Sequence, residues 1–270
     1  MKTAGLLREK ITTIVILLSA CFFLVQNTGC GLDSFYVLDA PLSDGHTAYY
    51  TADDYAQKYF SLMTYETGTN ADYLTSSSEL SFKGTEVYYK IYNNLSTMQS
   101  NQSAISSLNT ASNYSAAAER LIETQGYKQL KLSNGAITPL IKATGKNRYV
   151  YIRLTDYGGS EAYQQGICVA SSIMNSYDSS NALTYNGVAV FPRRYINSSY
   201  TFNFGGDNSD TDKVPTKDDD DVTWSTTTME TGKWYVDMYA ISIGKDTTFS
   251  NSYSLVLHLG SMTIVQGEKN

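Results

Sequence analysis

The chain has 270 residues, of which 42% are hydrophobic and 17% charged, a composition sufficient for a packed globular body and unlike that of a disordered tail. Acidic residues outnumber basic ones by 26 to 20, which gives a formal net charge of −6 and argues against a broad basic face for nucleic acid. Tyrosine is frequent, at 23 residues, and proline is rare, at 4, which favours aromatic strands over proline-rich linkers.

An apolar run near the N-terminus predicts an export signal. The basic residues Lys2, Arg8 and Lys10 precede this run, which extends from Ile11 to Val25 without a charge. Its 15 residues would form a helix of about 22 Å, shorter than the roughly 30 Å hydrocarbon core of a bilayer. The pattern therefore favours a cleaved signal helix over a transmembrane helix.

The sequence NTGC at residues 27–30 resembles the relaxed lipobox of bacterial lipoproteins. That resemblance implies cleavage before Cys30, a diacylglycerol on its thiol and an acylated amino terminus. Cys21, in the sequence LSAC, offers an alternative site with a better bare motif. We prefer Cys30, because cleavage at Cys21 would leave the apolar residues 22–25 in the mature chain and shorten the signal helix. An ordinary signal peptide beside an incidental cysteine is a further alternative.

Cleavage before Cys30 would leave Cys168 as the only other cysteine, so no intramolecular disulfide could form and the core alone would hold the body together. Cys168 lies in the apolar run 166–170 with no histidine near it in sequence, and we interpret it as a small buried hydrophobe rather than a nucleophile. We expect residues 30–45 to be a tether that enters the fold and residues 46–270 to form one domain.

Alternating patterns predict half-buried strands along most of this domain. Aliphatic positions alternate with tyrosine or polar positions most clearly in residues 86–92, 148–157, 234–244 and 255–259. Shorter candidates are residues 81–82, 167–170, 188–191 and 200–204. Glycine, asparagine and serine turns between these segments favour an antiparallel sandwich over a parallel sheet.

Two segments depart from this pattern. Residues 95–126 are rich in serine, asparagine, glutamine and alanine and predict a helical insertion that stops at Gly126. Residues 205–221 are acidic and rich in turn formers, which predicts a loop outside the core. Its carboxylates could supply ligands to Ca²⁺, but their spacing fits no EF-hand, so a hydrated loop is favoured and we predict no metal site and no cofactor.

Three stretches resemble spirochaete-type bacterial lipoproteins: CGLDSFYVL at 30–38, SFKGTEVYYKIYNN at 81–94, and the C-terminal residues 234–265. The resemblance covers the anchor and about a third of the body. It implies a mainly β fold, an antiparallel immunoglobulin- or fibronectin type III-like β-sandwich with insertions, anchored to a membrane and without catalytic activity. The functional residue that it carries over is the acylated Cys30.

Six tyrosines lie opposite the aliphatic positions of their strands and suggest a ligand-binding surface: Tyr88, Tyr92, Tyr149, Tyr151, Tyr235 and Tyr239. An exposed aromatic platform of this kind would stack sugar rings. The alternative is that the rings pair across strands or lie beneath the helical insertion, which is the usual role of aromatic residues in sheets.

The sequence carries no motif for nucleophilic, zinc-dependent or nucleotide chemistry, and no pair of carboxylates that suggests glycoside hydrolysis. We interpret His46 as a loop residue and His258 as an outward strand residue. We therefore expect an exported, non-catalytic bacterial lipoprotein, held to the membrane by acyl chains, with a structural or adhesive role towards a protein or glycan ligand. The alternative is a secreted or periplasmic polysaccharide-acting enzyme or carbohydrate-binding module.

Overall fold

The computed structural model describes residues 36–75, 80–135, 139–156, 160–204, 214–227 and 232–265. These residues are mainly β, with antiparallel sheets and few helices, which confirms the coarse fold class expected from the alternating pattern. The predicted signal helix and both candidate acylation sites, Cys30 and Cys21, lie outside the described residues.

Three long strands form the centre of the body: β2 (Leu80–Tyr92), β13 (Lys233–Asp246) and β14 (Asn251–Val265). They pair antiparallel in the order β2-β13-β14, with Tyr239 opposite both Tyr88 of β2 and His258 of β14. Three short strands pair with the other edge of β2: β5 (Ile141–Lys142), β3 (Lys128–Gln129) and β12 (Val222–Thr223). The pairing of β12 with β2 is parallel, an exception to the predicted antiparallel pattern.

Two small sheets pack against one face of these long strands. One contains β1 (Phe60–Met63), β6 (Tyr149–Arg153) and β7 (Gly166–Ala170), and the other contains β4 (Lys131–Leu132), β10 (Pro192–Ile196) and β11 (Ser199–Phe202). A separate hairpin joins β8 (Thr184–Tyr185) to β9 (Val188–Ala189). The main apolar core lies between these layers and includes Phe60, Leu62, Val87, Ile91, Val150, Ile152, Val236 and Met238.

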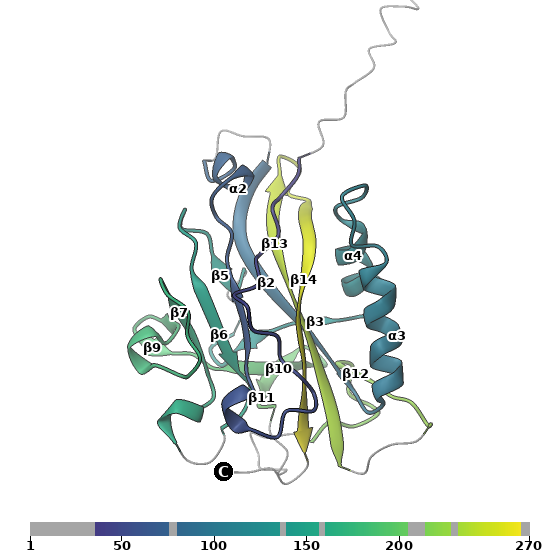
Figure 1. Cartoon of the computed structure of the whole chain (residues 1–270). Coiled ribbons are helices and arrows are strands. Elements are labelled where there is room, and N and C mark those ends of the chain that lie inside the picture. The colour runs from purple at the N-terminus through teal and green to yellow at the C-terminus, as the bar shows by residue number, and fades with distance from the viewer. Residues whose placement is uncertain are drawn as a thin grey trace, which may run out of the picture. The chain divides into compact units, whose positions relative to one another are not determined.

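Helices cover part of the opposite face of the long strands. Figure 1 shows α3 and α4 on one side of the three long strands, and β6 and β7 on the other side. The helical segment consists of α3 (Leu95–Ser106), α4 (Ala116–Glu119) and a π-helical turn, η2 (Arg120–Thr124). The other helices are single turns: η1 (Tyr55–Gln57), α2 (Thr69–Asp72), η3 (Glu161–Tyr163) and η4 (Ser179–Asn181).

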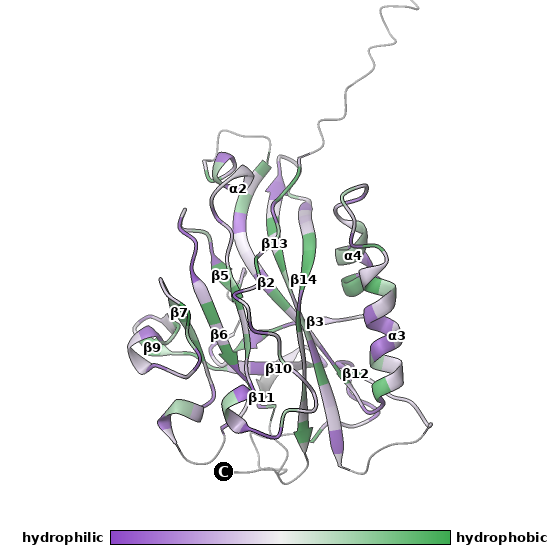
Figure 2. Ribbon diagram, in the orientation of Figure 1, coloured by the Kyte–Doolittle hydropathy of each residue, from purple (hydrophilic) through white to green (hydrophobic). Residues whose placement is uncertain are grey.

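The helical insertion begins and ends where the sequence predicts. The side chain of Asn94 accepts a hydrogen bond from the Thr97 N–H at 2.9 Å and caps α3, while Gly126 ends the insertion with a φ of +65°. Met98 and Ile105 of α3 are buried against the sheet, and much of the rest of α3 is hydrophilic, as Figure 2 shows. The insertion is therefore a one-sided cover that connects β2 to β3.

Part of the predicted tether belongs to the body. Leu38 is 1% exposed and packs beside Leu80 and Gly244, at the end of the central sheet. The backbone of Asp39 exchanges two hydrogen bonds with the side chain of Asn70, each 2.9 Å long. Apolar side chains and backbone hydrogen bonds therefore hold the predicted tether to the body from about Leu38 onward.

One edge of β14 is covered by side-chain and backbone groups. The Asn109 amide donates to the Val256 carbonyl and accepts from the Val256 N–H, both at 2.9 Å, in the way that a neighbouring strand would. Further along the same edge, the Ala48 N–H donates to the Leu259 carbonyl and the Ser261 N–H donates to the Ala48 carbonyl.

A buried guanidinium draws the end of the acidic segment into the body. Arg194 is fully buried, and its Nη2 lies 2.8 Å from Asp219 Oδ2 and 2.8 Å from Asp221 Oδ1. Asp221 also accepts hydrogen bonds from Arg194 Nε and from the hydroxyl of Tyr89, both at 2.9 Å. The prediction of a hydrated loop over residues 205–221 is therefore wrong at Asp219 and Asp221, and residues 205–213 lie outside the described part of the chain.

We expect the Asp221→Asn variant to lose about 3–5 kcal/mol of unfolding free energy, because it would leave the Arg194 charge only partly neutralised in the core. The adjacent Asp218 is a matched control, since its side chain is 81% exposed and Asp218→Asn should change stability by no more than about 0.5 kcal/mol. Chemical denaturation of both variants at neutral pH measures the difference. Equal midpoints would contradict a stabilising role for the buried pair.

Candidate functional site

The predicted tyrosine platform is not exposed. Tyr149 is half-buried, and the other five rings are at most 7% exposed: Tyr88, Tyr92, Tyr151, Tyr235 and Tyr239. Four of these five belong to the cluster beneath α3 and α4, whereas Tyr151 packs with Tyr59 and Cys168 in the small sheet. The expectation of an exposed sugar-stacking platform is therefore wrong for these five rings: the helical insertion covers four of them, and Tyr151 is buried in the small sheet.

A buried carboxylate lies among these rings. Asp237 is fully buried, and it accepts hydrogen bonds from the Tyr127 hydroxyl at 2.5 Å and from Gln102 Nε2 at 2.8 Å. His258 Nε2 lies 2.7 Å from the same carboxylate, and the imidazole stacks on Tyr239 with ring centroids 4.6 Å apart. Burial raises the pKa of Tyr127 well above its ordinary value, and the nearby charge of Asp237 raises it further.

His258 borders a hollow of about 550 Å³ between α3 and β14, and its side chain is 37% exposed. The outward strand position predicted for His258 agrees with this exposure, but the hydrogen bond to Asp237 was not foreseen. The nearby hydroxyls of Ser103 and Ser107 donate to carbonyl oxygens of their own helical segment. These hydroxyls therefore serve the helix rather than form a nucleophile–base pair with His258.

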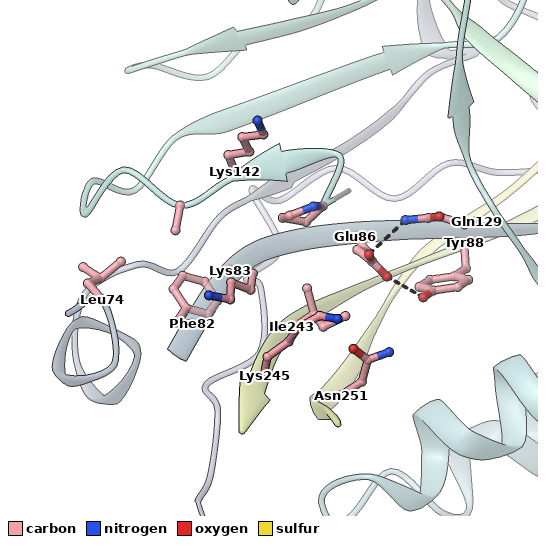
Figure 3. Close-up of a pocket in the computed structure, with 12 residues that line it drawn as sticks. Leu74, Phe82, Lys83, Glu86, Tyr88, Gln129, Lys142, Ile243, Lys245 and Asn251 are labelled. Atoms are coloured by element: carbon pink, nitrogen blue, oxygen red, sulfur yellow. Dashed lines mark hydrogen bonds between the residues drawn. The ribbon is translucent and has the colours of Figure 1, made fainter. Parts of the chain in front are cut away.

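A second pocket lies on the same face of the sheet, at the end that α3 leaves open. It has a volume of about 660 Å³ and lies where β2 begins and β13 ends (Figure 3). Its apolar lining consists of Leu74, Phe82, Tyr88, Pro139, Ala143 and Ile243, and its polar lining of Lys83, Glu86, Gln129, Lys142, Lys245 and Asn251. We call it the lysine pocket.

Local backbone geometry brings β5 to this pocket. Gly84 of β2 has a φ of +136°, and a Cβ at this position would lie only 2.1 Å from the Ile141 carbonyl oxygen. A side chain at residue 84 would therefore push β5 away from β2. Since Pro139 and Lys142 flank that contact, Gly84 is what allows them to line the pocket.

Glu86 is the acidic group of the lysine pocket and is only 2% exposed. The Tyr88 hydroxyl donates to its Oε2 at 2.5 Å and Gln129 Nε2 donates to its Oε1 at 2.9 Å, as the dashed lines in Figure 3 show. Burial raises the pKa of Glu86, although the Tyr88 hydrogen bond and the charges of Lys131 and Lys245 oppose that shift. The Glu86 carboxyl thus accepts two hydrogen bonds in a position that is largely shielded from solvent.

Three lysines also line this pocket, and the charge of one of them, Lys245, acts on Glu86. Lys83 and Lys142 are exposed and Lys245 is half-buried, so three cations border one small apolar cavity in a chain whose net charge is −6. Such an arrangement attracts an anionic group and shelters an apolar body beside it. In the described part of the chain, Glu86 is the only carboxylate that lines the pocket, so the pair of carboxylates needed for glycoside hydrolysis is not assembled there.

The other residues singled out from the sequence have ordinary surroundings. Cys168 is fully buried, as expected of a small hydrophobe, and its thiol contacts the Asp178 carbonyl at 3.4 Å. His46 stacks on Tyr59 with ring centroids 3.8 Å apart. Within the described ranges, no cluster of three or more histidine, cysteine or acidic residues could hold a metal ion, and no helix is long and apolar enough to cross a membrane.

Sequence reasoning missed the lysine pocket because its residues come from separate strands. Phe82 and Glu86 lie in two neighbouring predicted strands with Lys83 between them, but Lys142 and Lys245 are distant in sequence. A local signal did exist, because Glu86 and Asp237 are acidic residues at positions that alternate with aliphatic ones on predicted strands. An acidic residue on the aromatic face of a predicted strand therefore indicates a buried polar site on that face.

Comparison with known proteins gives no identification. No protein-family model matches the chain, and no curated protein and no solved structure shows a significant match. The resemblance to spirochaete-type lipoproteins therefore stays a prediction, and the function has to be inferred from the geometry of the site.

We expect the pKa of Glu86 to make folding stability fall as the pH rises. Because burial raises this pKa in the folded state, the folded chain keeps the proton to higher pH than the unfolded chain does. The stabilisation is complete below the ordinary value of 4.5 and is lost as the pH rises through the raised value.

The Glu86→Gln variant cannot ionise, so the unfolding free energy of the unsubstituted protein minus that of the variant should fall with pH, by at most about 1.4 kcal/mol per pH unit. Denaturant titrations from pH 4.5 to neutrality measure this difference. Glu161→Gln at an exposed position is the control and should give a flat difference. A flat difference for Glu86→Gln as well would contradict the raised pKa.

Proposed function

We propose that the chain is an exported bacterial lipoprotein of the spirochaete type, acylated on Cys30, whose body binds a ligand without transforming it. The support for the anchor is the basic start, the apolar run and the NTGC sequence at residues 27–30. We also propose that the body is a modified immunoglobulin- or fibronectin type III-like sandwich. Antiparallel sheets facing one another over a shared core support that proposal.

The lysine pocket carries the proposal of ligand binding. Its apolar floor includes Phe82 and Ile243, its mouth carries three lysines, and Gln129 and Asn251 add groups that can form hydrogen bonds. A ligand that fits this lining is small and has one anionic group next to an apolar or ring-shaped body. An acidic sugar or another organic anion belongs to this class. We therefore propose the lysine pocket, rather than the tyrosine platform, as the site for a glycan ligand.

The second candidate function is that of a polysaccharide-acting enzyme, and the raised pKa of Glu86 is the observation that favours it. A carboxyl that stays protonated in a pocket could act as a general acid. Hydrolysis also needs a partner carboxylate about 5–10 Å away. Since none of the other described residues that line the pocket is acidic, binding explains the pocket better. Release of reducing ends from polysaccharides by the purified protein would reverse this preference.

Binding of an anionic aromatic probe tests the pocket. We expect anilinonaphthalene sulfonate to bind there, and expect Lys245→Gln or Lys142→Gln each to raise its Kd by about 2- to 5-fold, because one attractive charge is removed. Lys217→Gln is the matched control, since this lysine is 66% exposed and does not line the pocket. Fluorescence titrations at low and high salt measure the Kd, and added salt should weaken binding to the unsubstituted pocket. An equal Kd for all three variants would contradict an anion-binding pocket.

Mass spectrometry of the mature N-terminus, prepared from membranes, tests the anchor. We expect acyl chains on Cys30, their loss in Cys30→Ala and their retention in Cys21→Ala. The reverse pattern would move the anchor to Cys21. An unmodified N-terminus in the soluble fraction would contradict the lipoprotein proposal and favour the secreted enzyme.

A further inference from the structure

Phe249 occupies a position that disfavours its side chain in two ways. It lies in the loop between β13 and β14, has a φ of +63° and is 80% exposed. A left-handed backbone conformation is strained for a bulky residue and suits glycine or asparagine. Exposure of the ring to water adds no stability to the fold. The local turn therefore does not explain why a phenylalanine is present, whereas a contact outside the body would.

The loop that carries Phe249 borders the lysine pocket. Lys245 pairs with Asn251 across the β13–β14 hairpin, and both residues line the pocket. Lys83 and Lys142 lie at the mouth of the same pocket, so an exposed ring and three cations share one end of the body. Asp246 is a half-buried acid of the turn, and its carboxylate accepts the N–H groups of Thr248 and Ser250. The three lysines that line the pocket outnumber this acid of the turn.

The chain enters the body at this same end. Leu38 packs beside Gly244, close to where β13 ends, and Figure 1 shows the first described residues next to the β13–β14 loop. Six residues, Gly31 to Tyr36, separate the proposed acylation site from the body, and the chain from Cys30 to Val37 can span at most about 25 Å when fully extended. An acylated Cys30 would thus keep the end with Leu38 within that distance of the lipid.

We propose that the end of the body formed by the β13–β14 loop and the lysine pocket docks on the anchoring membrane, with Phe249 in the interface and the headgroup of an anionic lipid in the pocket. This inference rests on the proposed lipid anchor and names an anionic lipid as the ligand of the pocket. An aromatic ring prefers the interfacial zone of a bilayer, and lysines beside it attract anionic headgroups.

Site-specific fluorescence quenching in vesicles tests the docking. The acylated protein is reconstituted into vesicles of phosphatidylcholine, with or without phosphatidylglycerol, that contain a lipid-borne quencher. A thiol-reactive fluorophore is placed at Thr247→Cys, next to Phe249, or at Val188→Cys, which is 67% exposed on the distant hairpin β8–β9. Cys168 is fully buried and an acylated Cys30 has no free thiol, so the new cysteine takes the label.

We expect strong quenching at residue 247 and little at residue 188, and expect phosphatidylglycerol to increase the quenching at 247. Phe249→Gly should remove most of that quenching without lowering the thermal unfolding midpoint, because glycine suits the positive φ. Lys245→Gln should weaken only the response to phosphatidylglycerol. Equal quenching at both positions, or no effect of Phe249→Gly, would overturn the docking. Sedimentation that shows a second copy of the chain covering this end would overturn it as well.

The anchor and the docking can fail separately. Acylated Cys30 with equal quenching at the two positions would leave the lipoprotein proposal standing and overturn the docking. If Cys30 proves unacylated, the same pair of labels is compared in a chain that carries Cys21→Ala and Cys30→Ala. Preferential quenching at 247 would then support the docking without the lipid anchor, and equal or absent quenching would overturn it.

Discussion

The buried charge of Arg194 constrains several elements of this body at once. Its guanidinium lies in the core, where an unpaired cation would be very unfavourable, and it therefore requires the carboxylates of Asp219 and Asp221. Asp221 in turn binds the hydroxyl of Tyr89 on the central strand β2. Three segments that are far apart in sequence are thus held together without a disulfide, and Cys168 is the one cysteine in the described part of the chain. Since acidic side chains have to fold inward to satisfy this charge, they also fix the place of β12 beside β2.

Periodicity predicted the strands well, because the alternation along β2, β6, β13 and β14 is a local property of the sequence. The helical insertion was also predictable, since its cap, its composition and Gly126 are local signals. Alternation says which residues share a face but not what covers that face, so the burial of the tyrosines required knowledge of where α3 and α4 pack. The burial of Asp219 and Asp221 was missed for a related reason, because their partner Arg194 lies 25 and 27 residues earlier in the chain.

One face of the central sheet has two different roles along its length. Where α3 and α4 cover it, aromatic rings fill the space and Asp237 is satisfied by Tyr127, Gln102 and His258. Where the cover ends, the same rows of side chains continue as Glu86, Ile243 and Lys245 and line an open pocket. The length of the helical insertion therefore decides how much of the sheet is core and how much is available to a ligand. This explains how a face that alternates regularly in sequence forms core beneath the helices and an open pocket beyond them.

The amide of Asn109 satisfies backbone groups of β14 that would otherwise be free to pair with another strand. Exposed strand edges promote association between the sheets of neighbouring molecules. Asn109, together with the backbone of Ala48 further along, thus covers this edge, and Asn109 does so only while the helical insertion stays folded on the sheet. Local unfolding of the insertion would therefore expose the tyrosine-rich face and this strand edge together.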